Sequence, residues 1–284
     1  MALLPQLSFE FFPPRTDQAV SDLKQTSKIL AGYNPEFFSV TFGAGGGTRE
    51  LTTETVRELG GRTGIEVAPH ISCVGASREA ILHSLAVYFE MGVKRIVVLR
   101  GDLPSGDIGV GEFRFASDLV EFIRFKKGKS FRIEVAAYPE FHPQSVNASS
   151  DLLNFKRKVD AGANSAITQF FYNVDSYTRL IENCEKLGIS IPIVPGVMPI
   201  TNYRNLSRFA SVCGAEIPRW LDKRLLEYEE DLESLRSFGV DVVTKLCERL
   251  IAAGAPGLHF FSLNKHSSIS AICDFLGYGY DAVE

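Results

Sequence analysis

The chain has 284 residues, of which 45% are hydrophobic and 23% charged, the composition of an ordinary globular protein with enough apolar residues for a large core. Its net charge of -4, without a long run of lysine or arginine, excludes the basic surface that nucleic acids and anionic membranes bind. Five scattered cysteines without a Cys-x-x-Cys pair predict neither a disulfide framework nor a zinc site. No leader-like N-terminus or apolar stretch of roughly 18 residues is present, so we expect a cytoplasmic protein.

In chain order, short β-like runs alternate with amphipathic segments. The predicted strands cover residues 7–12, 37–41, 66–71, 96–99, 132–137, 166–170, 193–197 and 257–263. The predicted helices cover residues 17–31, 51–62, 81–89, 116–127, 151–161, 175–187, 202–212 and 234–253, and a polar insertion is expected at residues 221–233.

Eight strands, each followed by a helix, predict an α/β fold, a (β/α)8 barrel of the TIM type, because the chain length is near the usual size of about 250 residues. No linker divides the sequence, so we expect one domain over residues 1–284. A doubly wound parallel sheet is the alternative, because periodicity does not show whether a sheet closes.

Polar and ionisable side chains gather at the same end of nearly every predicted strand. They are Glu10, Thr41, His70, Arg100, Asp102, Tyr138, His142, Gln169 and Lys265. In a barrel the C-terminal ends of the strands meet at one rim, where the active sites of this architecture lie. One such residue often only caps a loop, whereas the whole set predicts a functional rim.

Asp102 follows a buried run at residues 96–99, and Pro104 prevents that run from continuing as a regular central strand. The carboxylate is therefore expected just beyond a strand end. Its alternative role is to cap the following loop.

Glu10 lies in the first strand, where alternation places Ser8 and Glu10 on one face and Phe9 and Phe11 on the other. A carboxyl held among aromatic residues is desolvated, so its neutral form is favoured and it can donate a proton. The alternative is a hydrogen-bonded structural acid.

The segment 151–159 separates at helical spacing into an apolar stripe and a polar one. Asp151, Asn154 and Lys158 share the polar stripe, and Arg157 flanks it. This stripe is either a site for a diphosphate and ribose-like hydroxyls or a solvated outer helix face. The glycines at residues 43–47 are weak support for a phosphate site, because they lack Gly-x-Gly-x-x-Gly spacing.

Seven longer motifs occur in order along the chain: Ser8-Phe-Glu-Phe-Phe-Pro-Pro-Arg15, Ser39-Val-Thr-Phe-Gly-Ala44, Ala68-Pro-His70, Leu99-Arg-Gly-Asp-Leu-Pro104, Ala136-Ala-Tyr-Pro-Glu140, Leu153-Asn-Phe-Lys-Arg-Lys-Val-Asp-Ala-Gly-Ala163 and Ile167-Thr-Gln-Phe-Phe171. From residue 7 to residue 275 the sequence closely resembles the methylenetetrahydrofolate reductase family in its bacterial form. The resemblance implies a barrel that binds FAD and reduces 5,10-methylenetetrahydrofolate to 5-methyltetrahydrofolate. Hydride would pass from NADH or NADPH to FAD and then to the folate, and the protein would be a homo-oligomer.

The same resemblance implies roles for individual residues. Glu10 would be the general acid and Asp102 the carboxylate beside the flavin ring. FAD would be held by Thr41, Ala44, His70, Arg100, Gly101, Asp102, Ala116, Tyr138, His142, Asp151, Asn154, Arg157 and Lys158. The substrates would be bound by Glu10, Gln169, Asn205, Phe209 and Lys265.

Three positions depart from the family pattern: Asn205 where glutamine is frequent, Lys265 where arginine is frequent, and Phe115 where tyrosine is common. Lys265 would face the folate's glutamate tail, and a lysine does not form the bidentate carboxylate fork of an arginine. The family's extra C-terminal domain, which binds S-adenosylmethionine in eukaryotic relatives, has no counterpart before Glu284, so we expect activity indifferent to that ligand.

The implied roles are chemically consistent. Opening the imidazolidine ring of the substrate needs a proton on the departing nitrogen, which a neutral Glu10 can supply, and yields a 5-iminium cation. An ionised Asp102 in a low-dielectric cleft would stabilise that cation. Two other classes stay open: a flavin-free barrel lyase or aldolase with a Schiff-base lysine, and a non-catalytic binding barrel. Both predict a colourless protein instead of a yellow one.

Overall fold

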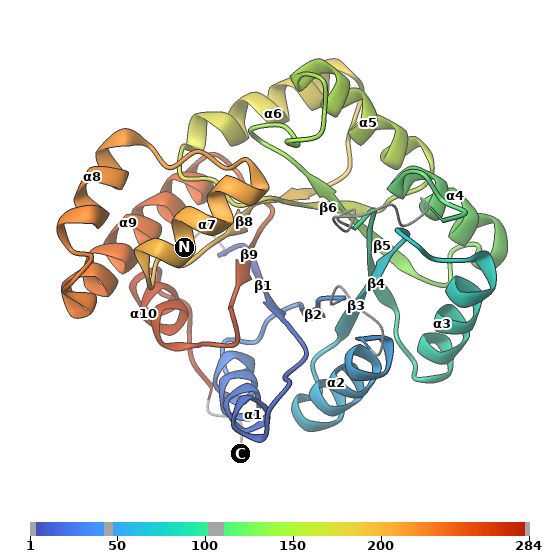
Figure 1. Cartoon of the computed structure of the whole chain (residues 1–284), viewed down its shortest axis with the longest axis horizontal. Coiled ribbons are helices and arrows are strands. Elements are labelled where there is room, and N and C mark those ends of the chain that lie inside the picture. The colour runs from blue at the N-terminus through green and yellow to red at the C-terminus, as the bar shows by residue number, and fades with distance from the viewer. Residues whose placement is uncertain (1–3, 43–47, 102–110, 282–284) are drawn as a thin grey trace.

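The computed structural model describes residues 4–42, 48–101 and 111–281. Its strands form one parallel sheet from β1 (Gln6–Phe11), β2 (Phe37–Val40), β3 (Val67–Ser72), β4 (Arg95–Leu99), β5 (Arg132–Ala137), β6 (Ser165–Thr168), β7 (Ile193–Val194), β8 (Gly196–Val197) and β9 (Gly257–Phe261). Its helices are α1 (Asp17–Ala31), α2 (Thr48–Thr63), α3 (Arg78–Glu90), α4 (Ala116–Lys127), α5 (Ala148–Asp160), α6 (Val174–Lys186), α7 (Tyr203–Cys213), α8 (Arg219–Glu227), α9 (Leu232–Ala252) and α10 (Ser267–Phe275). The helices surround the strands as a ring (Figure 1), so the predicted (β/α)8 barrel is confirmed.

The seventh barrel strand joins the two ends of the sheet. It was expected to be continuous over residues 193–197, but Pro195 divides it into β7 and β8. β7 pairs with β6 and β8 pairs with β9, so the two halves of this strand close the ring. Pro195 has no N–H to donate, which explains the interruption, while its carbonyl accepts the His259 N–H at 3.0 Å. This closure excludes the doubly wound alternative.

The polar insertion predicted at residues 221–233 is wrong. The segment contains α8, whose Leu221 and Leu225 are buried, and α9 begins at Leu232 after the N-cap Asp231. Two apolar residues one turn apart suffice to fix a short helix against the barrel, and the charged residues around them hid that signal in the sequence. In Figure 1, α8 lies on the outside of the helix ring.

Helix starts were also predicted too late. α5 begins at Ala148 and not at residue 151, because the Asn147 side chain accepts the Ser150 N–H at 2.9 Å and caps the helix there. The early start places Asp151 in the first turn of α5.

The main core lies between the strands and the helices. Phe9 and Phe11 of β1 point into it, together with Phe38 and Phe260 from the neighbouring strands, and all four are fully buried. The Phe11 and Phe38 rings meet edge to face with centroids 5.0 Å apart, a favoured geometry. The predicted alternation in β1 is therefore confirmed, and Ser8 and Glu10 face the barrel interior.

An ion network fills the amino-terminal end of the barrel interior. The Arg95 guanidinium pairs with Glu36, and lies 3.3 Å from Glu134 Oε1 and 3.8 Å from Glu66 Oε1. It also lies 4.1 Å from the centre of the Phe37 ring, where cation and ring attract each other. Desolvation by burial raises the pKa of Glu66. Because this end is filled, the opposite end of the barrel is left for a binding site.

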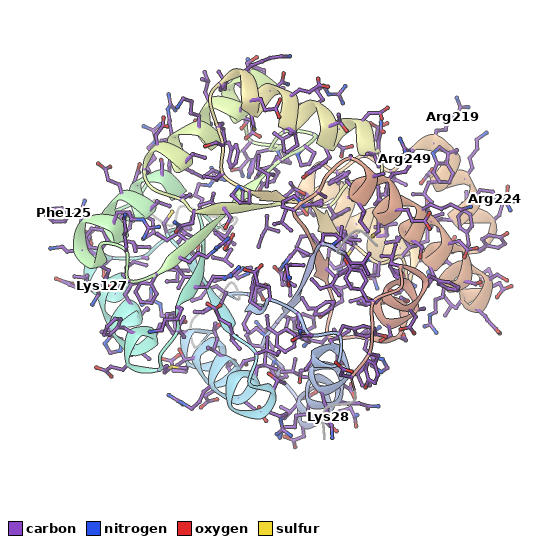
Figure 2. All side chains as sticks on the ribbon, turned by 180° about the vertical axis from the view of Figure 1, so that it is seen from behind. Lys28, Phe125, Lys127, Arg219, Arg224 and Arg249 are labelled. Carbon is purple, nitrogen blue, oxygen red and sulfur yellow. The ribbon has the colours of Figure 1, made fainter. Side chains whose placement is uncertain are left out.

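The outer helix surface carries exposed side chains of several kinds. Figure 2 shows Phe125, Lys127, Arg219 and Arg224 at the outer edge of the molecule, away from the barrel interior. None of the described helices combines the length and the apolar composition that crossing a membrane requires.

Candidate active site

Glu10 lies inside the barrel near the C-terminal ends of the strands, next to two histidines. Its Oε2 is 3.4 Å from His70 Nε2 of β3 and 3.8 Å from His259 Nε2 of β9. The Glu10 side chain is 20% exposed, whereas those of His70 and His259 are 7% and 0% exposed. The carboxyl is therefore the member of the three that a ligand at the barrel mouth can reach.

The surroundings of Glu10 differ from the sequence prediction. A carboxyl among aromatic rings was expected, but Phe9 and Phe11 pack on the other side of the sheet, against the helices. The near neighbours are imidazoles instead. Desolvation lowers the pKa of His70, an effect that Glu10 opposes and His259 reinforces, so His70 is neutral near pH 7.

A second group of predicted residues meets beside the ends of β4 and β5. The Lys158 ammonium of α5 donates to the Ala136 carbonyl. Desolvation lowers the pKa of Lys158 to about 8, Asp151 acts against this shift, and Arg100 adds to it. The polar stripe of α5 is thus turned toward the strand ends at Lys158. Two cations beside one carboxylate leave an excess positive charge, which suits an anionic ligand.

The segment after β5 connects these groups. Arg100 Nη2 donates to the Gln144 side chain, and Ser145 Oγ donates to Asp151 Oδ1 at 2.8 Å. The rings of Tyr138 and His142 meet edge to face at 4.7 Å. The loop therefore holds both Arg100 and Asp151 in place.

Gly101 follows Arg100 with a φ of +84°, which favours glycine. A Cβ at this position would also collide with the Ser72 hydroxyl, which donates to the Arg100 carbonyl at 2.9 Å. The end of β4 is thus pressed against the end of β3. Asp102 and Ala44, which were predicted to lie nearby, are outside the described residues.

The remaining predicted residues are distributed around the same rim. Thr41 follows β2 and donates its N–H to Phe11 O at 2.9 Å, and Gln169 follows β6 with its Oε1 accepting the Phe170 N–H at 2.9 Å. Four others occupy these places: Ala116 begins α4, Asn154 accepts from Arg157 at 2.8 Å, Phe209 lies half-buried on α7, and Asn205 and Lys265 are exposed. Among the described residues no recorded contact joins Asn205, Phe209 or Lys265 to Glu10.

Sequence reasoning missed His259 and Asn264, both on or just after β9. Asn264 has a φ of +55°, and its side chain accepts the Phe12 N–H at 3.0 Å and donates to Phe12 O at 2.9 Å. Ser262 Oγ donates to the Glu10 carbonyl, so β9 holds the end of β1 from both sides of Glu10. The signal for His259 was present: alternation from Gly257 puts it on the inward face.

Comparison with known proteins then decides the family. The family model described as Methylenetetrahydrofolate reductase matches residues 4–277. The chain belongs to this family. It is 43% identical to the 5,10-methylenetetrahydrofolate reductase of Buchnera aphidicola subsp. Schizaphis graminum, over 96% of this chain and 92% of the relative. It is 41% identical to the enzyme of the same name from Escherichia coli (strain K12), over 95% of this chain and 90% of the relative.

Other similarities agree with the family. Methylenetetrahydrofolate reductase (NADH) 1 of Arabidopsis thaliana is 38% identical over 95% of this chain, which spans 48% of that relative. A solved structure from Clostridium thermocellum, described as binding two copies of 5-methyl-5,6,7,8-tetrahydrofolic acid, superposes with a TM-score of 0.63 over 95% of both chains. At 16% identity that likeness shows the fold alone. As a family member, the protein is an oxidoreductase of the methylenetetrahydrofolate reductase type.

Proposed function

We propose that this reductase moves a hydride from NADH or NADPH, by way of FAD, to 5,10-methylenetetrahydrofolate, and that the two substrates use one site in turn. The observation that carries the proposal is the accessible Glu10 carboxyl beside two buried imidazoles at the open end of the barrel. A reductase of this substrate needs an acid at such a position, because the ring opens only when the departing nitrogen is protonated.

The described residues fit FAD. Arg100 and Lys158 supply cations for a diphosphate, and Asp151 is an acceptor for ribose hydroxyls. Gly101 lets the backbone approach a ligand closely. Ser39 Oγ is buried without a hydrogen-bond partner in the described structure, a further polar atom toward the interior. When bound, FAD would supply the chemistry of accepting and then donating a hydride.

The chain's own residues would carry the proton. Glu10 gives its carboxyl proton to the nitrogen that leaves the methylene carbon, the C–N bond breaks with its electron pair on that nitrogen, and an iminium cation remains. Glu10 ends this step as a carboxylate beside His70 and His259. Asp102 is proposed, by family resemblance, as the ionised group that stabilises the cation.

A flavin-free lyase or aldolase is the weaker candidate. Schiff-base catalysis in a barrel needs a lysine that reaches the interior, and none of the described strands contains one. Lys265 follows β9 but is exposed. The ionisable groups around Glu10 likewise favour a catalyst over a passive binding barrel.

The decisive experiment is anaerobic mixing of the purified protein with each nicotinamide and then with the folate. We expect a yellow protein whose flavin absorbance is bleached by NADH or NADPH and recovers when 5,10-methylenetetrahydrofolate is added, with 5-methyltetrahydrofolate as product. A colourless protein that binds no added FAD, or bleached flavin that the folate does not reoxidise, would refute the proposal. Light scattering on the same sample would test the expected homo-oligomer.

A further inference from the structure

Ser8 and His259 form a fixed pair beneath Glu10. Ser8 Oγ lies 2.7 Å from His259 Nδ1, and both side chains are buried, at 3% and 0% exposure. The two residues are also opposite each other in the β1–β9 register, with Glu10 two residues further along β1. The Phe37 ring stacks on the His259 imidazole at 5.9 Å, and Phe261 meets it edge to face at 5.5 Å. The imidazole is therefore held in one orientation.

The hydrogen bond also selects the tautomer of His259. Among the described residues, His259 Nδ1 is the one recorded partner of the Ser8 hydroxyl, so the hydroxyl donates its proton to that nitrogen. The proton of the neutral ring then resides on Nε2, the nitrogen that faces Glu10 Oε2 at 3.8 Å. His259 Nε2 is buried without a hydrogen-bond partner in the described structure, and a donor in that state gains most from a charged acceptor.

We propose that His259, fixed by Ser8, is a positioning residue for Glu10 that donates its Nε2–H to the carboxylate formed when Glu10 gives up its proton. The inference rests on the proposed function, since it deepens the proton step of that reaction. His259 itself neither gains nor loses a proton: the proton goes from Glu10 to the departing folate nitrogen, and the imidazole stabilises the anion left behind. The described groups that face the carboxyl are His70 from β3 and His259 from β9.

Three substitutions test the pair. His259→Leu removes the donor, His259→Gln places an amide N–H near the position of Nε2, and Ser8→Ala releases the tautomer without touching the ring. Ser270→Ala is the matched control, because it also deletes a buried hydroxyl without a recorded partner, but on α10, outside the barrel interior. All four variants are measured as FAD-loaded protein, separately in the nicotinamide and folate half-reactions.

We expect His259→Leu to slow the folate half-reaction by about 10- to 100-fold, the rate equivalent of one hydrogen bond to a charged group. His259→Gln should recover part of this loss, Ser8→Ala should show a smaller loss, and Ser270→Ala none. The nicotinamide half-reaction needs no proton from Glu10 and should change little. Because the lost contact stabilises the carboxylate, the alkaline limb of the folate rate in His259→Leu should also move to higher pH.

Nuclear magnetic resonance of 15N-histidine-labelled protein gives a readout that is independent of turnover. His259 is assigned by its absence in His259→Gln, and we expect its proton on Nε2 in the unmodified chain and a mixture of tautomers in Ser8→Ala. A proton on Nδ1 of the unmodified chain would overturn the inference. So would equal losses in both half-reactions without a pH shift, including the case in which His259→Leu misfolds and Ser8→Ala is normal throughout. Failure of the unmodified protein to reduce the folate would instead refute the proposed function.

Discussion

Lys158 provides the sharpest test of the proposed FAD site, because its charge is predicted to disappear within an accessible pH range. Desolvation lowers the pKa of this ammonium from 10.5 to about 8. The ammonium is then about nine tenths protonated at pH 7 and about one tenth protonated at pH 9. A diphosphate that requires the charged form should therefore bind about tenfold more weakly at pH 9 than at pH 7.

The assay is titration of the FAD-free protein with FAD, followed by quenching of flavin fluorescence at several pH values. Lys158→Met should weaken binding by about 10- to 100-fold at pH 7, the cost of one charge-assisted hydrogen bond, and should abolish the dependence on pH. Lys156→Met is the control, because Lys156 lies on the same helix but pairs with Asp160 at 2.7 Å. Unchanged affinity in Lys158→Met, or an equal loss in Lys156→Met, would show that this reasoning is wrong.

Four further predictions follow from the same structure. Glu10→Gln should leave flavin reduction by nicotinamide nearly intact and slow reoxidation by the folate by at least about 10²-fold in stopped-flow traces; loss of both steps would mean a structural role. Asp102→Asn should raise the flavin midpoint potential and slow the folate step more than the nicotinamide step, and an unchanged potential and rate would remove Asp102 from the mechanism. Arg95→Leu should cost about 3 kcal/mol in urea unfolding, since it leaves buried carboxylates unpaired, whereas Arg62→Leu, at an exposed pair, should cost less than about 1 kcal/mol. Gly196→Ala should lower the thermal midpoint, because the added Cβ would lie 2.7 Å from a ring atom of β9 and overpack the barrel by about 1 to 3 kcal/mol; an unchanged midpoint would contradict this.

The order and type of most elements were predictable because they depend on local periodicity. Alternation in the first strand placed Ser8 and Glu10 on one face, and the structure confirms it. The failures occurred where a few contacts override a local signal. Pro195 splits a strand that still completes the barrel, and two buried leucines fix α8 within a charged segment.

The candidate site was only partly predictable. Sequence motifs indicated the family and singled out Glu10, Arg100 and Lys158, but they gave the wrong surroundings for Glu10. His259 meets Ser8 across 251 positions of sequence, and this contact exists only because β9 pairs with β1 in a specific register.

What the sequence alone determined is therefore the set of elements, the face on which each strand residue lies, and the family. The tertiary structure decided which of the inward residues share the space around Glu10, and with it the charge and hydrogen-bond environment of that acid. The physical reason is that periodicity is a property of neighbouring residues, whereas the contact between β1 and β9 depends on closure of the whole barrel.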